Sequence, residues 1–134
     1  MGQARSPSWQ GGASKVTTYD VEPWQKIDGT VLRDSDFNDA LVQKIGNLAA
    51  PDFLALETST LQRAHMLFVD GPKDRVFEKT FVENVFPLLK TGTFVIFDDI
   101  RLLNMLGIWN SISLPKIDLT SFGHHTGTGI VRIP

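Results

Sequence analysis

Two short apolar runs that each end in aspartate constrain the fold of this chain more than any other feature. The segment HMLFV, at residues 65–69, leads into Asp70. The segment TFVIF, at residues 93–97, leads into Asp98 and Asp99. Runs of this length predict buried strands, and the stretch between them has the apolar spacing of a helix. Parallel strands joined by a crossover helix end at the same edge of a sheet, so we expect the three carboxylates to be neighbours in space.

The rest of the chain predicts further elements of an α/β domain. Residues 15–21 (KVTTYDV) are β-branched and aromatic, and Pro23 ends the strand that they predict. Residues 116–133 predict two strands around a glycine-rich turn at 123–129. The remaining predictions are strands at 29–33, 65–69 and 93–97, and helices at 37–48, 51–63, between Asp74 and Pro87, and at 102–112.

Length and composition indicate one domain that binds a small molecule. The chain has 134 residues, of which we expect 1–14 to form a flexible arm and 15–134 the domain. The net charge is −2 without a basic cluster, which argues against nucleic acid and acidic membranes as partners. The absence of cysteine excludes disulfides and thiolate chemistry. No apolar run approaches the ~18 residues of a membrane span, so we expect a soluble, cytoplasmic protein.

Asp20 and Trp24 are candidate ligand-binding residues at the end of the first predicted strand. A carboxylate offers paired acceptors for the vicinal hydroxyls of a ribose, and strand ends are where such ligands bind in α/β sheets. Trp24 could cover the face of an adenine ring. The alternatives are a carboxylate that only ends a strand and a tryptophan that only packs.

The carboxylates of Asp70, Asp98 and Asp99 form a candidate metal site. Three acids at adjoining strand ends repel one another unless a cation, a lysine or protonation relieves them. Mg²⁺ suits an all-oxygen site of this kind. The alternative is that Asp70 and Asp98 cap neighbouring helices.

Lys73 and His124 are the candidate catalytic bases. Lys73 follows Asp70 by three residues and could reach the same edge of the sheet, although it could equally pair on the surface with Asp74 or Glu78. Histidine titrates near neutral pH, so His124 could face the site as a base. Two adjacent histidines in a polar turn, His124 and His125, are otherwise solvated.

Taken together, these residues resemble the class I methyltransferases that use S-adenosylmethionine. The resemblance covers residues 15–134 and is carried by the segments TTYDVEPW, MLFVDGPKD and TFVIFDDI and by the final pair of strands. It implies a Rossmann-like, mostly parallel sheet with flanking helices and a C-terminal antiparallel hairpin. It also implies S-adenosylmethionine as cofactor, with Asp20, Trp24 and Asp70 in its binding site.

Within that family, DGPKD followed by FDD is most similar to the metal-dependent O-methyltransferases. The similarity implies that Asp70, Asp98 and Asp99 hold Mg²⁺ and that Lys73 serves as the base, with a small-molecule hydroxyl as methyl acceptor. Asp99 stands where that group has asparagine, which adds a negative charge to the site.

One family feature is missing, because no apolar strand with a glycine-rich turn precedes Lys15. The sequence therefore resembles a family member that lacks its first strand and is N-terminally truncated. The unpaired N–H and C=O groups of a sheet edge can pair with a strand of another chain, so we expect a homo-oligomer formed through such edges. Two alternatives remain: a non-catalytic Rossmann-like remnant that acts through oligomer contacts, and another Mg-dependent, nucleotide-handling enzyme.

Overall fold

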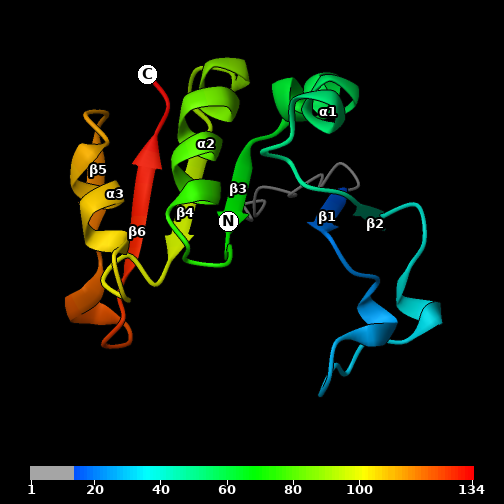
Figure 1. Ribbon diagram of the computed structural model, residues 1–134. Helices are drawn as coiled ribbons and strands as arrows, with labels where there is room; N and C mark the ends of the chain where they lie inside the picture. The colour runs from blue at the N-terminus through cyan, green and yellow to red at the C-terminus, as the bar shows by residue number, and fades with distance from the viewer. Residues whose placement is uncertain (1–13) are drawn as a thin grey trace, which may run out of the picture. The chain divides into compact units, whose positions relative to one another are not determined.

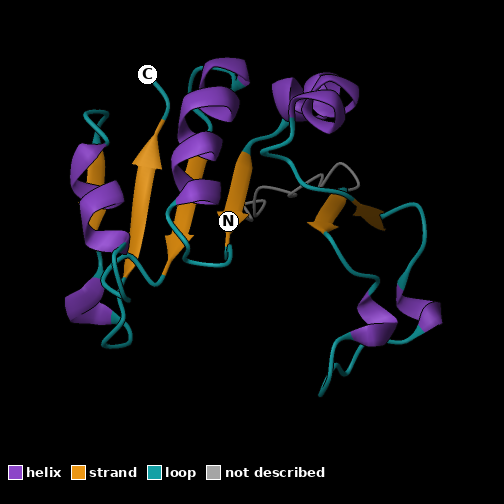
Figure 2. Cartoon of the chain, viewed as in Figure 1, coloured by secondary structure: helices purple, strands orange, loops and turns teal. Residues whose placement is uncertain are grey.

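The computed structural model describes residues 14–134, so the predicted arm lies almost wholly outside the described residues. The chain divides into two compact units, residues 1–47 and 48–134. Each unit contains a sheet of its own, and helices connect the strands of the second unit (Figures 1 and 2). The chain is therefore a mixed α/β protein.

The first unit is built on a pair of parallel strands. β1 (Val16–Asp20) confirms the strand predicted at 15–21, and it pairs with β2 (Leu41–Ile45) along its full length. The connection between them contains two short 3₁₀ turns, Trp24–Lys26 and Asp34–Asp36. The two strands end side by side at Asp20 and Ile45.

Two predictions for this first unit are wrong. Residues 29–33 form no strand, and the helix predicted at 37–48 is replaced by β2. The apolar spacing in this stretch fits a helix as well as a strand, and pairing with β1 decides in favour of the strand. The side chain of Asn38 accepts a hydrogen bond from the Ala40 N–H at 2.8 Å, which turns the chain into β2.

The second unit contains a four-stranded sheet in the order β3-β4-β6-β5. β3 pairs with β4 in parallel, while β6 runs antiparallel to both β4 and β5. The predicted strands at 65–69 and 93–97 and the predicted C-terminal hairpin are confirmed. The strands are β3 (Met66–Val69), β4 (Phe94–Asp98), β5 (Lys116–Asp118) and β6 (Thr128–Arg132).

Three α-helices belong to the same unit. α1 (Pro51–Arg63) has the predicted bounds, with proline in its first turn. α2 (Val76–Val85) is the crossover between β3 and β4, and α3 (Met105–Ser111) follows β4. None of the helices in residues 14–134 is long and apolar enough to cross a membrane.

α2 and α3 pack on one face of the four-stranded sheet (Figure 2). Phe81 on α2 meets Phe97 on β4 edge to face, with ring centroids 6.3 Å apart. Trp109 on α3 lies over Gly129 on β6, which pairs directly with Phe97. The core of the unit lies between these helices and the sheet and includes Leu61, Phe81, Val85, Phe86, Val95, Phe97, Ile100, Met105, Trp109 and Val131.

The prediction that β3 is buried on both faces is wrong. Val69 is buried, but Met66 and Phe68 are 63% and 62% exposed. Successive side chains of a strand point to opposite faces. One face of β3 therefore lies under the helices, while the other is open in the part of the chain that the structure describes.

Candidate active site

The C-terminal ends of β3 and β4 bring the predicted carboxylates to one edge of the sheet. The two strands are parallel and in register, with Phe68 opposite Ile96, so the central prediction of a strand, helix and strand unit is confirmed. Asp70 follows β3 directly. Asp98 ends β4, and Asp99 comes next.

The loop before β6 brings His124 to the same edge. The main chain of this loop is bound to the loop after β4, because the N–H groups of Ile100 and Arg101 donate to the carbonyls of Gly127 and Thr126 at 3.1 and 2.8 Å. Gly127 has a φ of 83°, a left-handed conformation that favours glycine. Two antiparallel strands and these bonds therefore fix the place of His124 relative to β4.

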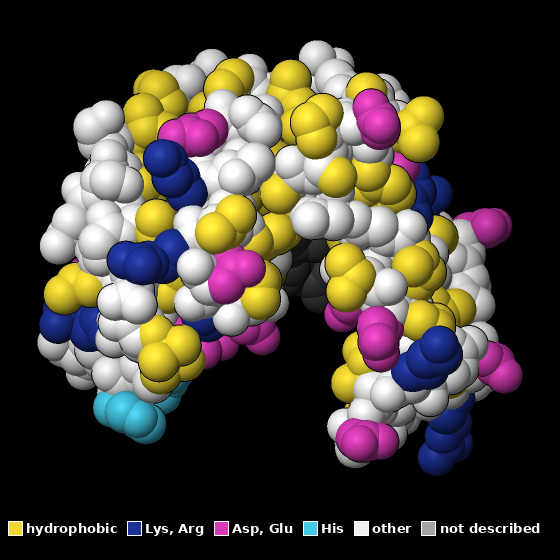
Figure 3. Space-filling view, in the orientation of Figure 1, with side chains coloured by type: hydrophobic (Ala, Val, Ile, Leu, Met, Phe, Trp, Pro, Cys, Tyr) yellow, Lys and Arg dark blue, Asp and Glu magenta, His cyan; other side chains and the backbone are white. Residues whose placement is uncertain are grey.

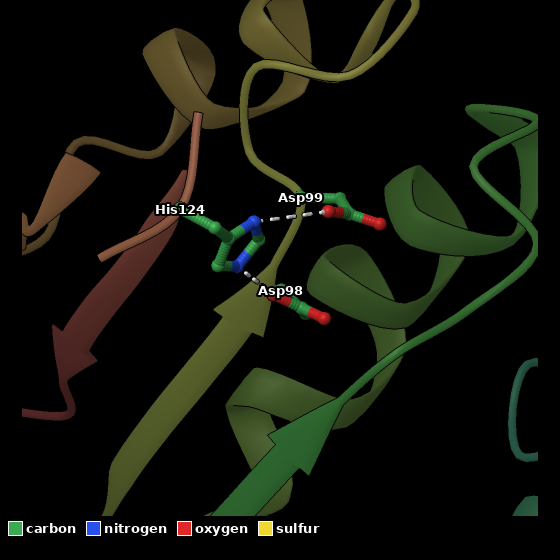
Figure 4. Close-up of side chains that lie close together, drawn as sticks. All are labelled: Asp98, Asp99 and His124. Atoms are coloured by element: carbon green, nitrogen blue, oxygen red, sulfur yellow. Dashed lines mark hydrogen bonds and ion pairs between the residues drawn. The ribbon is translucent and has the colours of Figure 1, made fainter. Parts of the chain in front are cut away.

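The imidazole of His124 lies between the two aspartates (Figure 4). Its Nε2 is 2.9 Å from Oδ1 of Asp98, a distance at which the ring N–H donates to the carboxylate. Its Nδ1 is hydrogen-bonded to the hydroxyl oxygen of Thr126, and the single proton of that hydroxyl is donated to Asp99. The predicted residue His124 is thus part of a connected polar network and not a solvated turn residue.

Asp98, Asp99 and His124 also form the group that could hold a metal ion. One ligand atom from each lies within 4.8 Å of the others, and all three side chains are at least partly exposed. Asp70 is not a member of this group, although it was predicted together with Asp98 and Asp99. Two carboxylates and an imidazole are a donor set that suits transition metals such as Mn²⁺ or Zn²⁺ better than Mg²⁺.

Lys73 lies between the carboxylates of the two loops. Its Nζ is 2.7 Å from Oδ1 of Asp70 and 3.8 Å from Oδ2 of Asp99, and only 7% of its side chain is exposed. The predicted proximity to Asp70 is therefore seen, while the alternative pairing with Asp74 or Glu78 is not: Glu78 instead accepts the main-chain N–H of Lys73 at 2.8 Å. The ammonium group relieves the repulsion between Asp70 and Asp99.

Glu78 holds the loop after β3 in place, a role that the sequence does not predict for it. Its carboxylate is 1% exposed and accepts the N–H groups of Lys73 and Arg75, at 2.8 and 3.0 Å. The signal in the sequence is its position in the first turn of the helix, where a glutamate commonly reaches back to main-chain N–H groups.

The two loops at this edge of the sheet contain unusual backbone conformations. Among residues 14–134, positive φ angles outside glycine occur at Lys73 (61°), Arg75 (71°), Asp99 (57°) and Leu103 (50°). Such conformations are costly and persist where the surroundings enforce them, which is common at functional sites.

The first unit contains the other two predicted residues, Asp20 and Trp24. Asp20 ends β1, and its Oδ1 accepts the N–H of Glu22 at 3.0 Å. The main-chain N–H of Trp24 donates to the side chain of Gln43 on β2 at 2.9 Å, and its ring stacks on Phe37 with centroids 5.1 Å apart. A hollow of about 340 Å³ lies beside this pair of rings and is lined further by Leu41 and Ile45.

Arg101 connects the loop after β4 to the segment after β5. Its Nη2 is 2.6 Å from Oδ2 of Asp118, and its Nε donates to the Thr120 hydroxyl at 2.9 Å. The hydroxyl and the main-chain N–H of Thr120, followed by Arg101, lower the pKa of Asp118 from 3.8 to about 2. This group of side chains ties the loop that carries Asp99 to β5 and the residues that follow it.

We expect the Asp118→Asn variant to be less sensitive to acid than the parent chain. Because folding depresses the pKa of Asp118, its charged form stabilises the fold above pH 3.8, and that contribution is lost as the pH falls towards about 2. Urea denaturation midpoints measured over this range should fall more steeply for the parent than for the variant. Parallel slopes would contradict the assignment.

Residues 7–100 match the family described as a methyltransferase domain. The matched stretch includes both parallel strand pairs and ends directly after Asp98 and Asp99. It covers more than half of the chain.

The chain belongs to this methyltransferase family.

The predicted resemblance to class I methyltransferases is thereby confirmed. The methyltransferase match contains Asp20, Trp24, Asp70 and Lys73 as well as the paired aspartates, and it does not reach His124. A search of curated proteins and a search of solved structures each found no match. The roles of the individual residues therefore rest on the geometry described above.

Proposed function

We propose that the chain transfers a methyl group from S-adenosylmethionine to a hydroxyl oxygen of a small molecule. Membership of the methyltransferase family supports the reaction type. The choice of a hydroxyl as the methyl acceptor is supported by the hydrogen bond between His124 and Asp98 at the end of β4. A hydroxyl must lose its proton when the methyl group is transferred, and a histidine held by a carboxylate is suited to accept it.

The residues of the first unit fit the adenosine part of the donor. Asp20 supplies a carboxylate at a strand end, where the two hydroxyls of a ribose can bind. The hollow of about 340 Å³ beside Trp24 falls within the roughly 300–1,000 Å³ typical of ligand pockets, and the aromatic and aliphatic side chains in its lining suit an adenine ring. When bound, S-adenosylmethionine supplies a methyl group on a sulfonium centre that is open to attack by an oxygen nucleophile.

We assign His124 as the base that takes the proton from the acceptor hydroxyl. With the Nε2 proton donated to Asp98, a neutral imidazole has its free lone pair on Nδ1, the nitrogen that faces the Thr126 hydroxyl oxygen. That hydroxyl gives its single proton to Asp99 and supplies none to Nδ1. An acceptor hydroxyl that replaces Thr126 there can give up its proton to Nδ1 as the new carbon–oxygen bond forms. The carboxylate of Asp98 then stabilises the imidazolium, as in other histidine–carboxylate pairs.

Lys73 has a different role in this proposal from the predicted one. As an ammonium group paired with Asp70, it has no lone pair with which to accept a proton. Its position between Asp70 and Asp99 instead keeps two acidic loops together and leaves the edge of the sheet less negative. Asp70 remains a candidate contact for the donor.

A divalent cation would be held by Asp98, Asp99 and His124 if the reaction uses one. Bound there, it would orient the acceptor oxygen and favour its deprotonation. His124 would then be a metal ligand and not the base. A chelator such as EDTA should leave methyl transfer unchanged if His124 is the base, and should abolish it if His124 is a metal ligand. Methyl transfer is therefore measured with and without EDTA.

Methyl transfer measured with S-adenosylmethionine labelled in its methyl group tests the proposal. The acceptors are a panel of catechols, phenols, aliphatic alcohols and, as a contrast, amines and thiols. We expect label in hydroxyl compounds and continued transfer in the presence of EDTA. Transfer only to amines or thiols would contradict the proposed acceptor, and loss of transfer with EDTA would assign His124 to a metal.

We expect the Asp20→Ala variant to bind S-adenosylhomocysteine about tenfold more weakly than the parent chain, because it loses hydrogen bonds from the ribose to a charged acceptor. Quenching of tryptophan emission during titration measures the affinity. Glu22→Ala is the matched control, since Glu22 is a neighbouring exposed carboxylate outside β1. Equal affinities for the two variants would remove Asp20 from the donor site.

A further inference from the structure

Within residues 48–134, the face of the four-stranded sheet opposite α2 and α3 is apolar and exposed. Direct pairing places Met66 beside Phe94, Phe68 beside Ile96, and Ile96 and Ile117 beside Ile130, so these side chains share one face. We call this surface the open sheet face; it consists of Met66, Phe68, Phe94, Ile96, Ile117 and Ile130.

The exposure of this face is high for such large apolar side chains. Met66, Phe68 and Ile117 are each more than 60% exposed, and Phe94 is 46% exposed. On the other side of the same strands, Val95, Phe97 and Val131 are at most 1% exposed. Figure 3 shows the side that carries α2 and α3, where hydrophobic side chains are scattered among charged ones.

Parallel strands such as β3 and β4 are normally covered on both faces, and antiparallel strands with one face in water normally carry polar side chains on that face. Contiguous apolar patches of this kind mark interaction sites more often than scattered single side chains do. The open sheet face lies within the second unit alone, and it contains no charged side chain at its centre. It therefore fits a partner surface that is itself flat and apolar.

Charges at the two ends of this face indicate what that partner is. Arg132 lies beside Phe94 at one end, and Asp98 lies beside Thr128 at the other end, both on the same side of the sheet. Two copies packed face to face with antiparallel strands would bring Arg132 of each towards Asp98 of the other. Packing with parallel strands would instead bring like charges together.

We propose that the open sheet face is the interface of a twofold dimer of this chain, packed sheet against sheet with antiparallel strands. Isologous contacts require a surface that is complementary to itself, which an apolar centre with opposite charges at its two ends provides. The symmetry axis then passes between the levels of Phe94 and Asp98, at the pair of Ile96 and Ile130. This interface differs from a dimer formed through sheet edges, which is the arrangement that the sequence predicts.

Sedimentation equilibrium of the full chain and two lysine variants tests the interface. The variants are Phe68→Lys on β3 and Ile117→Lys on β5, and these are the two outer strands of the sheet. A dimer formed through one sheet edge would be disrupted by one of these substitutions at most. We expect the mass of two chains for the parent and of one chain for both variants. Val76→Lys is the control, because Val76 is 71% exposed on α2, and it should remain dimeric.

Cysteine cross-linking gives a second readout that does not depend on disrupting the interface. The chain contains no cysteine, so Ile96→Cys introduces a single thiol beside the proposed axis. With a bismaleimide whose spacer bridges the ~10 Å between two packed sheets, we expect a covalent dimer from Ile96→Cys and none from Val76→Cys. A folded, monomeric parent chain would overturn the proposal. So would a dimer that keeps its mass in both lysine variants and fails to cross-link at residue 96.

Discussion

The Gly129→Ala variant should be about 3 kcal/mol less stable than the parent chain, a value near the upper end for overpacking in a core. A methyl group at residue 129 would lie 2.6 Å from two ring carbons of Trp109. The ring has little room to move, because Trp109 is 5% exposed and the Nζ of Lys116 lies over it at 5.0 Å from the centroid. Urea denaturation measures the change in the free energy of unfolding.

Gly107→Ala is the matched control for this prediction. Gly107 lies inside α3, and nothing lies within 4 Å of a methyl group added there. Alanine favours a helix over glycine by about 0.5–1 kcal/mol, so this variant should be more stable than the parent. Equal effects of the two substitutions would contradict the packing of α3 on β6.

The His124→Ala variant should lower kcat by about 10²- to 10⁴-fold, the usual contribution of a general base. The expected reason is the loss of the proton acceptor next to Asp98, with the fold unchanged because His124 is exposed. Initial rates with the best acceptor from the labelled transfer assay measure the effect. A fall in kcat with little change in the KM of the donor is expected.

His125→Ala is the control for the catalytic prediction. His125 is the adjacent exposed histidine, and it is not part of the group formed by Asp98, Asp99 and His124. Its removal should leave kcat within about twofold, as for a surface substitution away from the site. A comparable fall in kcat in the two variants would show that catalysis depends on the conformation of this loop and not on the imidazole of His124.

Local patterns in the sequence predict the half of the fold that positions the candidate site. The apolar runs of β3 and β4, with a helix between them, have lengths that allow only one simple arrangement, and right-handed parallel crossover then fixes where Asp70 and Asp98 lie. α1 begins at Pro51, as predicted, and ends at Arg63, near which its end is predicted.

The errors occur where distant residues decide the outcome. β2 reads as a helix in isolation, and only its pairing with β1, about 25 residues earlier, makes it a strand. The burial of β3 depends on what covers each face of the sheet, which no local pattern contains. The same reason explains why sequence analysis identified His124 as a candidate without its partners. Thr126 and the aspartates reach it through the antiparallel pairing of β4 and β6.

Every residue role proposed for the transfer of a methyl group requires that this chain binds S-adenosylmethionine. Isothermal titration calorimetry with S-adenosylhomocysteine, the product that remains after methyl transfer, tests this most directly. We expect saturable heat with one ligand bound per chain and weaker binding by Asp20→Ala. The absence of heat with the folded parent chain at millimolar ligand would contradict the proposed function.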